Sequence, residues 1–170
     1  ATHGFRNFLY NWMCSIKNME KNNASDSSSY PQSPSILDRT LIYTTDSNLA
    51  WELVSKRRFF NVFLDYRSSG DSDTSNSQNA LSFGTLPYQR LIMYRTIFIN
   101  QVLQLHNSPV LLADNDAVWL RDPFPIFNRE PFVQYDLLTQ NDGLPGKPNL
   151  TCGGFLYMRN TPGMKSVWSK

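Results

Sequence analysis

Two aspartates separated by one residue, Asp114 and Asp116, are the side chains of this sequence best placed to do chemistry. They follow the apolar run 110–113, which predicts a strand buried on both faces. Carboxylates buried at the end of a strand are unfavourable unless a positive group neutralises them. No lysine or arginine lies between Asp114 and Leu120, so the pair indicates a divalent cation. Because Mg²⁺ and Mn²⁺ accept one or two carboxylates together with substrate phosphates, we predict a metal–phosphate site here.

The same segment, Asp114-Asn115-Asp116, also suits a simple turn. Asp and Asn side chains hydrogen-bond to neighbouring backbone groups and tolerate left-handed geometry. A short D-x-D pattern is common, so its context has to distinguish the two interpretations. The apolar strand before it and the segment Val-Trp-Leu-Arg-Asp-Pro at residues 118–123 after it favour the metal–phosphate site.

Composition limits the classes of protein to which the chain can belong. The 170 residues are 41% hydrophobic, which is enough for one compact domain over residues 1–170. A net charge of +2 predicts no nucleic-acid partner. No apolar run reaches about 18 residues, so we expect no transmembrane segment within the chain. The sequence begins without a methionine or signal peptide and ends in an expected helix, so we expect a partial domain truncated at both ends.

Hydrophobic periodicity predicts helices that alternate with strands. Helices are expected at residues 5–19, 47–56, 87–105 and 124–127, with a last helix from Pro162, and Cys14 is expected to be buried on the first of them. Strands are expected at residues 40–45, 59–64, 110–113, 135–139 and 155–158. The polar stretches at about 21–35 and 67–82 are expected to be flexible insertions. This order predicts an α/β fold with a mostly parallel sheet flanked by helices, and ligands beyond the carboxyl ends of its strands.

Four segments follow one another in the order of a known family. They are residues 4–15, 88–95, 112–124 with Asp-Asn-Asp-Ala-Val-Trp-Leu-Arg-Asp-Pro, and 152–159 with Cys-Gly-Gly-Phe. Together they resemble the nucleotide-diphospho-sugar transferase domain, a group that includes plant cell-wall xylosyl- and arabinosyltransferases. The resemblance implies a Rossmann-like GT-A fold, a nucleotide-diphosphate sugar donor, a divalent metal (usually Mn²⁺, or Mg²⁺) and a glycan or glycoprotein acceptor. The implied reaction is hexosyl or pentosyl transfer, with retention of configuration favoured.

The resemblance also assigns roles to the acidic motif. Asp116 matches the acid that binds the metal directly. Asp114 matches the acid that contacts the ribose of the donor and supports the metal, often through water, and Asn115 between them joins the donor-binding set. The physical chemistry agrees, because a metal that bridges two phosphates neutralises the charge that develops on the leaving diphosphate.

Five further positions have a functional interpretation and a structural alternative. Arg95 matches a basic family position and would touch the donor as a catalytic or binding residue, or it forms a salt bridge. Asp46 would contact the nucleoside at the end of a strand, or it caps the helix that follows. Asp142 would face the donor sugar or the acceptor as a catalytic residue, or it belongs to an Asp-Gly turn. Gly153 and Gly154 would let the backbone approach a sugar closely, or they start a strand with unusual dihedral angles.

Other polar and aromatic positions are expected to be mainly structural. Trp119 is expected to pack in the core, although tryptophan also stacks on sugars. Arg121 and Asp122 are expected to supply a strand-end charge and a helix cap, and His106 ends a helix without a functional role. His3 would line the base pocket or be solvated.

One departure from the family pattern and two other classes of function remain open. No histidine, aspartate or glutamate follows Asp142, so a third metal ligand is expected beyond Lys170 or is absent. The D-x-D-x-Val pattern also fits a haloacid-dehalogenase-type phosphatase with Asp114 as nucleophile, and a non-catalytic sugar- or nucleotide-binding relative is a further alternative.

By resemblance we expect the protein to act in the Golgi lumen or secretory pathway, with a type II anchor outside these residues. Sequons at Asn23 and Asn149 favour the same compartment.

Overall fold

The computed structural model describes residues 3–24, 34–65, 82–143 and 150–169, and the chain divides into two compact units. The first unit comprises Ala1–Met93 and Asn115–Arg121, and the second comprises Tyr94–Asp114 and Asp122–Lys170. Each unit is organised around a hydrophobic cluster of its own. The acidic motif is therefore divided, since Asp114 ends a segment of the second unit and Asn115 begins a segment of the first.

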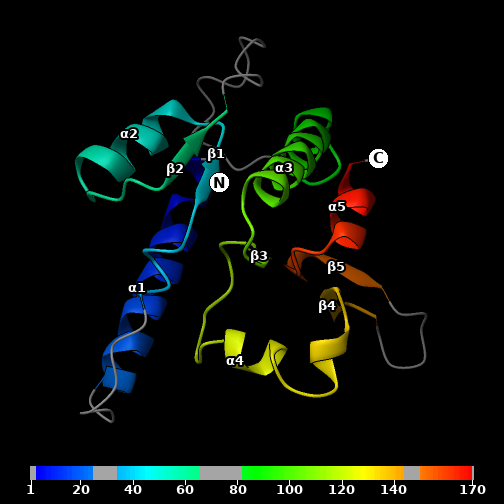
Figure 1. Ribbon diagram of the computed structural model, residues 1–170. Coiled ribbons are helices and arrows are strands. Elements are labelled where there is room, and N and C mark those ends of the chain that lie inside the picture. Colours follow the sequence, from blue (N-terminus) through cyan, green and yellow to red (C-terminus); the bar gives the residue numbers. More distant parts are fainter. Residues whose placement is uncertain (1–2, 25–33, 66–81, 144–149, 170) are drawn as a thin grey trace. The chain divides into compact units, whose positions relative to one another are not determined.

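The first unit contains a long helix and a short β–α–β segment (Figure 1). A 3-10 helix, η1 (His3–Phe5), leads into α1 (Arg6–Ala24). Strand β1 (Ile42–Thr44) is followed by α2 (Ser47–Ser55) and β2 (Val62–Leu64). The strands pair in parallel, with Ile42 opposite Val62 and Thr44 opposite Leu64. The helix between them is the crossover that a parallel pair requires, as the alternating pattern predicts.

Helix α1 continues beyond the end predicted for it. It ends at Ala24 rather than at residue 19, because Glu20 and Lys21 are good helix formers and a lysine is favourable near a helix C-terminus. The first predicted insertion therefore begins as helix, and its residues 25–33 lie outside the described residues, as do residues 67–81 of the second. The end of the first insertion is anchored, since the Glu20 carboxylate accepts hydrogen bonds from Ser35 Oγ at 2.8 Å and Ile36 N at 2.6 Å.

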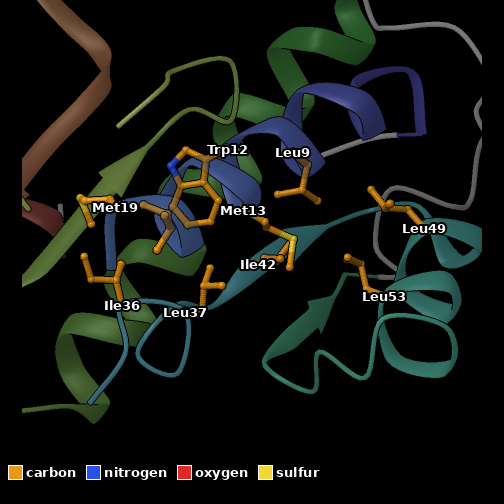
Figure 2. Close-up of a cluster of buried hydrophobic side chains, with 10 residues drawn as sticks. Leu9, Trp12, Met13, Met19, Ile36, Leu37, Ile42, Leu49 and Leu53 are labelled. Carbon is orange, nitrogen blue, oxygen red and sulfur yellow. The ribbon is translucent and has the colours of Figure 1, made fainter. Parts of the chain in front are cut away.

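One face of α1 forms the core of the first unit, and Figure 2 shows its side chains meeting those of β1 and α2. The buried cluster consists of Leu9, Trp12, Met13, Ile16, Met19, Ile36, Leu37, Ile42, Leu49 and Leu53. Burial of each such side chain contributes roughly 1.5–3 kcal/mol. Cys14 is exposed, so the prediction that it is buried is wrong. Position 14 falls outside the helical stripe 9, 12, 13, 16 that faces the core.

The second unit combines most of a long helix with a three-stranded sheet. Helix α3 (Leu86–Leu105) leads into β3 (Val110–Ala113), and α4 (Phe124–Phe127) and η3 (Phe132–Gln134) follow. Strands β4 (Leu137–Asn141) and β5 (Thr151–Met158) precede the last helix, α5 (Pro162–Trp168). Strand β5 lies between β3 and β4 in the sheet (Figure 1).

The α/β class is confirmed, but the sheet of the second unit is antiparallel, in contrast to the mostly parallel sheet predicted. Only nine residues separate Asn141 from Thr151, and a parallel crossover needs about a dozen or more. Strand β5 must therefore run back along β4. Its other edge pairs with β3, with Ala113 opposite Phe155. This pairing places the end of β3 beside the two glycines of β5.

The core of the second unit joins α3 and α5 to the sheet. Its buried residues are Ile99, Leu103, Leu156, Met158 and Met164, and Val110, Leu112 and Trp168 pack against them. Arg159 follows β5 and donates from Nε to Tyr135 O at 3.0 Å and from Nη2 to Phe127 O at 2.6 Å. These bonds tie α4 and the start of β4 to the central strand. None of the helices in the described part of the chain is long and apolar enough to cross a membrane.

Candidate functional site around Asp114

Asp114 lies directly after the last residue of β3 and remains bound to the central strand of its sheet. Its backbone N–H donates to the carbonyl of Gly154 at 2.8 Å, which continues the β3–β5 pairing one residue beyond Ala113. Its side chain is 51% exposed. The backbone of Asp114 is thus held by the sheet while its carboxylate remains accessible to a ligand.

Arg95 of α3 binds the side chain of Asp114. Its Nη1 lies 3.0 Å from Asp114 Oδ1, and its Nη2 donates to Gly153 O at 3.1 Å. The guanidinium therefore connects the acid after β3 with the backbone of β5. Asp114 has a positive partner that the local sequence does not reveal, because Arg95 lies nineteen residues earlier in the chain. The salt bridge foreseen as an alternative for Arg95 is present.

Gly154 leaves space that the Asp114 carboxylate occupies. A Cβ built at residue 154 would lie 2.3 Å from Asp114 Oδ2 and 2.9 Å from its Cγ. A Cβ at Gly153 would meet only Arg95 Nη2, at 3.8 Å, which is an ordinary contact. Both glycines lie inside β5, and Gly84 is the glycine with positive φ among the described residues. Gly154 thus accommodates the close approach of the Asp114 side chain, and no positive φ accounts for a glycine at this position.

Asn115 and Asp116 form a turn that belongs to the first unit. Asp116 is exposed, whereas Asn115 donates from Nδ2 to the carbonyl of Phe5 at 3.4 Å. The segment then enters the core. Trp119 N donates to Ser15 Oγ at 3.2 Å, and its ring packs edge-on against Trp12 with centroids 5.6 Å apart. The prediction that Trp119 is a core residue is confirmed.

Asp46 follows β1 and caps α2. Its Oδ1 accepts a hydrogen bond from Leu49 N at 3.0 Å, and its own N–H donates to Thr44 Oγ1 at 3.1 Å. This is the helix cap foreseen as the alternative for Asp46. The cap holds the side chain at the carboxyl end of a parallel strand, the edge at which α/β sheets bind ligands.

A second carboxylate at this edge, Asp65, was missed by the sequence interpretation. It directly follows β2 and is only 3% exposed. Its Oδ2 accepts a hydrogen bond from Tyr43 Oη at 3.0 Å, and its N–H donates to Thr44 O at 2.9 Å. The available signal was the one that identified Asp114, namely an apolar run that ends in an aspartate.

Asp142 lies in the connection that leaves β4. It is exposed, its N–H donates to Leu150 O at 2.7 Å, and the next N–H, of Gly143, donates to Asn141 Oδ1 at 2.8 Å. The first bond extends the pairing of β4 with β5, and the Asp-Gly turn expected as the alternative for Asp142 stays a prediction, because residues 144–149 lie outside the described residues. Arg121 is exposed, and Asp122 Oδ1 accepts from Phe124 N at 2.9 Å at the start of α4. The side chain of His3 lies outside the described residues.

The described residues offer few ligands for a metal ion. They contain no group of three or more His, Cys, Asp or Glu side chains that could bind one ion. The D-x-D motif offers two exposed carboxylates, and Oδ1 of Asp114 is already paired with Arg95. Such a hard-oxygen set suits Mg²⁺ or Mn²⁺, which take one or two carboxylates and complete their coordination with phosphates and water. Each of the two carboxylates is therefore of the donor type that such a metal takes.

These features define an α/β protein with an accessible, anchored carboxylate at the end of a sheet strand. The profile of a family described as nucleotide-diphospho-sugar transferase matches residues 35–170, which is most of the chain, and the protein belongs to this family. No curated protein and no solved structure matches the chain. Family membership makes the protein a glycosyltransferase whose donor is a nucleotide sugar.

Proposed function

We propose that the protein transfers a hexosyl or pentosyl group from its nucleotide-sugar donor to a glycan or glycoprotein acceptor, in a reaction that requires Mn²⁺ or Mg²⁺ and retains the anomeric configuration. The observation that carries this proposal is the way Asp114 is held: its backbone N–H is hydrogen-bonded to β5, while its carboxylate is half exposed. In a family that uses nucleotide sugars, a carboxylate fixed in this way is suited to recognise the hydroxyl groups of a ribose.

The two carboxylates of the acidic motif are proposed to have different roles in binding the metal and the donor. Asp116, exposed in the turn after Asp114, is the proposed direct metal ligand, and Asp114 supports the metal and contacts the ribose. When bound, the metal would neutralise the charge that develops on the leaving nucleoside diphosphate. Asn115 and Gly154 are proposed to help bind the donor, while Gly153 accepts a hydrogen bond from Arg95 through its backbone carbonyl.

Two further carboxylates are proposed to contact the ligands themselves. Asp46 lies at the carboxyl end of β1, where it would contact the nucleoside while it continues to cap α2. Asp142 is exposed beside β4 and would face the donor sugar or the acceptor. Both residues already have a structural role, so substitution tests must measure folding as well as activity.

The proposal is tested with full-length protein and a panel of nucleotide sugars. Release of free nucleoside diphosphate is measured with Mn²⁺, with Mg²⁺ and after removal of metal by a chelator. We expect release from one donor that stops on chelation and returns with Mn²⁺. The anomeric configuration of the product, read by NMR, tests retention. Turnover that is unaffected by chelation would refute the metal requirement.

Two alternative functions predict different results in the same assays. A non-catalytic relative would bind nucleoside diphosphate without releasing it from any donor. A phosphatase would use Asp114 as nucleophile and would form a trapped complex with beryllofluoride. Family membership and the engagement of Asp114 Oδ1 by Arg95 both favour the transferase.

The proposed place of action is the lumen of the Golgi apparatus or another secretory compartment. The sequons at Asn23 and Asn149 provide the chain's own support, because N-glycosylation occurs in that pathway. Asn23 lies in the last turn of α1, and Asn149 is outside the described residues. A mobility shift of the secreted protein on treatment with an N-glycosidase would support this localisation.

A further inference from the structure

We propose that Arg95 and Gly154 act together as positioning residues for Asp114, so that Arg95 serves the reaction through this carboxylate and not by touching the donor. The inference rests on the proposed function, in which Asp114 recognises the donor. It concerns Arg95, Asp114 and Gly154, which all belong to the second unit. Three separate features restrict the position of Asp114.

The backbone provides the first restriction. The hydrogen bond from Asp114 N to Gly154 O fixes the Cα of the acid at the end of the β3–β5 ladder. From that position the side chain still has several rotamers available. Further contacts are therefore needed to select one of them.

Arg95 provides the second restriction by using two of its nitrogens at once. Nη1 binds Asp114 Oδ1 and Nη2 binds Gly153 O, at 3.0 and 3.1 Å. A guanidinium is planar, and its donors point in fixed directions, so holding one end on β5 orients the other end toward the acid. The Arg95 side chain is 20% exposed, which leaves little of it accessible to a ligand. Its charge is directed at Asp114.

Gly154 provides the third restriction by having no side chain. The Asp114 carboxylate lies over its Cα, where a Cβ would be 2.3 Å from Oδ2. Real Cβ atoms do not approach so closely, so any other residue at position 154 would force the carboxylate to move. Arg95 therefore holds one oxygen of the acid, and Gly154 makes room for the other.

The first test uses substitution of the two neighbouring glycines. Gly154→Ala should displace the Asp114 carboxylate and weaken Mn²⁺-dependent binding of nucleoside diphosphate by about 10- to 100-fold, the usual effect of losing a supporting contact. Gly153→Ala inserts the same methyl group into the same strand, at 3.8 Å from its nearest neighbour, and should have a clearly smaller effect. Calorimetric binding measures this without turnover. Equal effects of the two variants would overturn the role of Gly154.

The second test separates positioning from donor contact by a double-mutant cycle. If Arg95 acts through Asp114, Arg95→Met should weaken nucleotide binding in the wild-type background and have almost no further effect in Asp114→Asn. If Arg95 touches the donor, the two effects should add. Arg95→Lys keeps the charge but not the two-point geometry, and we expect it to recover only part of the lost affinity. Additive losses, or full recovery with lysine, would overturn the inference.

Crystal structures of the same variants distinguish failure of this inference from failure of the proposed function. Absence of nucleotide binding and turnover in the wild-type protein would refute the function. The position of Asp114 is visible in either case, and we expect it to shift in Gly154→Ala and Arg95→Met but to stay in place in Gly153→Ala. An unmoved carboxylate in the first two variants would refute positioning.

Discussion

The hydroxyl of Tyr43 donates to the buried carboxylate of Asp65 across the two parallel strands of the first unit, at 3.0 Å. Tyr43 lies within β1 and Asp65 directly follows β2. The bond therefore fastens the carboxyl ends of two neighbouring strands. The Tyr43 ring also stacks on Phe63, with centroids 6.1 Å apart, so removing the hydroxyl alone leaves the packing in place.

Tyr43→Phe should reduce stability, because a buried acceptor loses one of its donors. A hydrogen bond within a protein contributes about 0.5–1.5 kcal/mol net, so the midpoint of urea unfolding should fall without a change in slope. Phe63→Tyr, which adds a hydroxyl on the neighbouring strand, serves as the comparison and should have a smaller effect. An unchanged midpoint in Tyr43→Phe would mean that this bond makes no net contribution.

Asp116→Asn should abolish most sugar transfer while preserving the fold. The side chain is exposed and the amide has nearly the same shape, so the melting temperature should change little. The amide lacks the negative charge that a hard cation requires, so the stimulation of nucleotide binding by Mn²⁺ should be lost. Calorimetry with and without Mn²⁺ measures this directly. Wild-type turnover by the variant would refute the metal assignment.

Asp142→Ala separates the two interpretations of the connection after β4. Its structural hydrogen bond is made by the backbone N–H, which alanine retains, so stability should be nearly unchanged. If the carboxylate faces the donor sugar or the acceptor, the rate of transfer should fall by at least about tenfold with the nucleotide affinity intact. Normal kinetics would assign Asp142 to the turn alone.

Glu52 should make the stability of the first unit depend on pH. Although burial raises its pKa, the Tyr10 hydroxyl, Arg6 and Lys56 lower it more strongly, and the net pKa is below the ordinary value of 4.5. A carboxylate with a lowered folded-state pKa stabilises the fold fully above its unfolded pKa. This contribution is lost as the pH falls from about 4.5 through the lower folded-state value.

The pH dependence predicted for Glu52 is tested by measuring the melting temperature of the wild type and of Glu52→Gln between pH 7 and pH 3, a range that includes roughly the pH values at which carboxylates titrate. The two proteins should differ most at neutral pH and converge in acid, because glutamine cannot pair with Arg6 as the charged carboxylate does. A difference that is independent of pH would show that Glu52 contributes by packing rather than by charge.

Two leucines near the end of α3 provide a paired test of the second core. Leu103 is fully buried in the cluster with Met158 and Met164, whereas Leu105 is 80% exposed. Leu103→Ala should cost about 2–5 kcal/mol through lost contacts and a cavity. Leu105→Ala should change stability by no more than about 0.5 kcal/mol. Urea unfolding of both variants measures the difference, and similar losses would contradict the assignment of the core.

Local features of the molecule were largely predictable from the sequence. The apolar stripe of α1 and the short run that forms β3 follow from periodicity, since a helix repeats every 3.6 residues and a buried strand is continuously apolar. The acidic motif was recognisable because two acids directly after an apolar run stand out from the hydrophobic pattern. The transferase family was recognisable because its motifs are short and contiguous.

The tertiary structure alone determined how distant residues meet. The antiparallel pairing of β5 with β3 and β4 is not visible in the apolar pattern, which is similar for both orientations, and the nine-residue connection that excludes a parallel crossover emerges only with the observed bounds of the two strands. This pairing places Gly154 beneath Asp114, and α3 brings Arg95 to the same acid from nineteen residues away. Neither relationship can be read from one stretch of sequence, because the ion pair and the close approach each join residues from different segments that meet only when the chain folds. The sequence therefore identified the acid, and the fold determined what holds it in place.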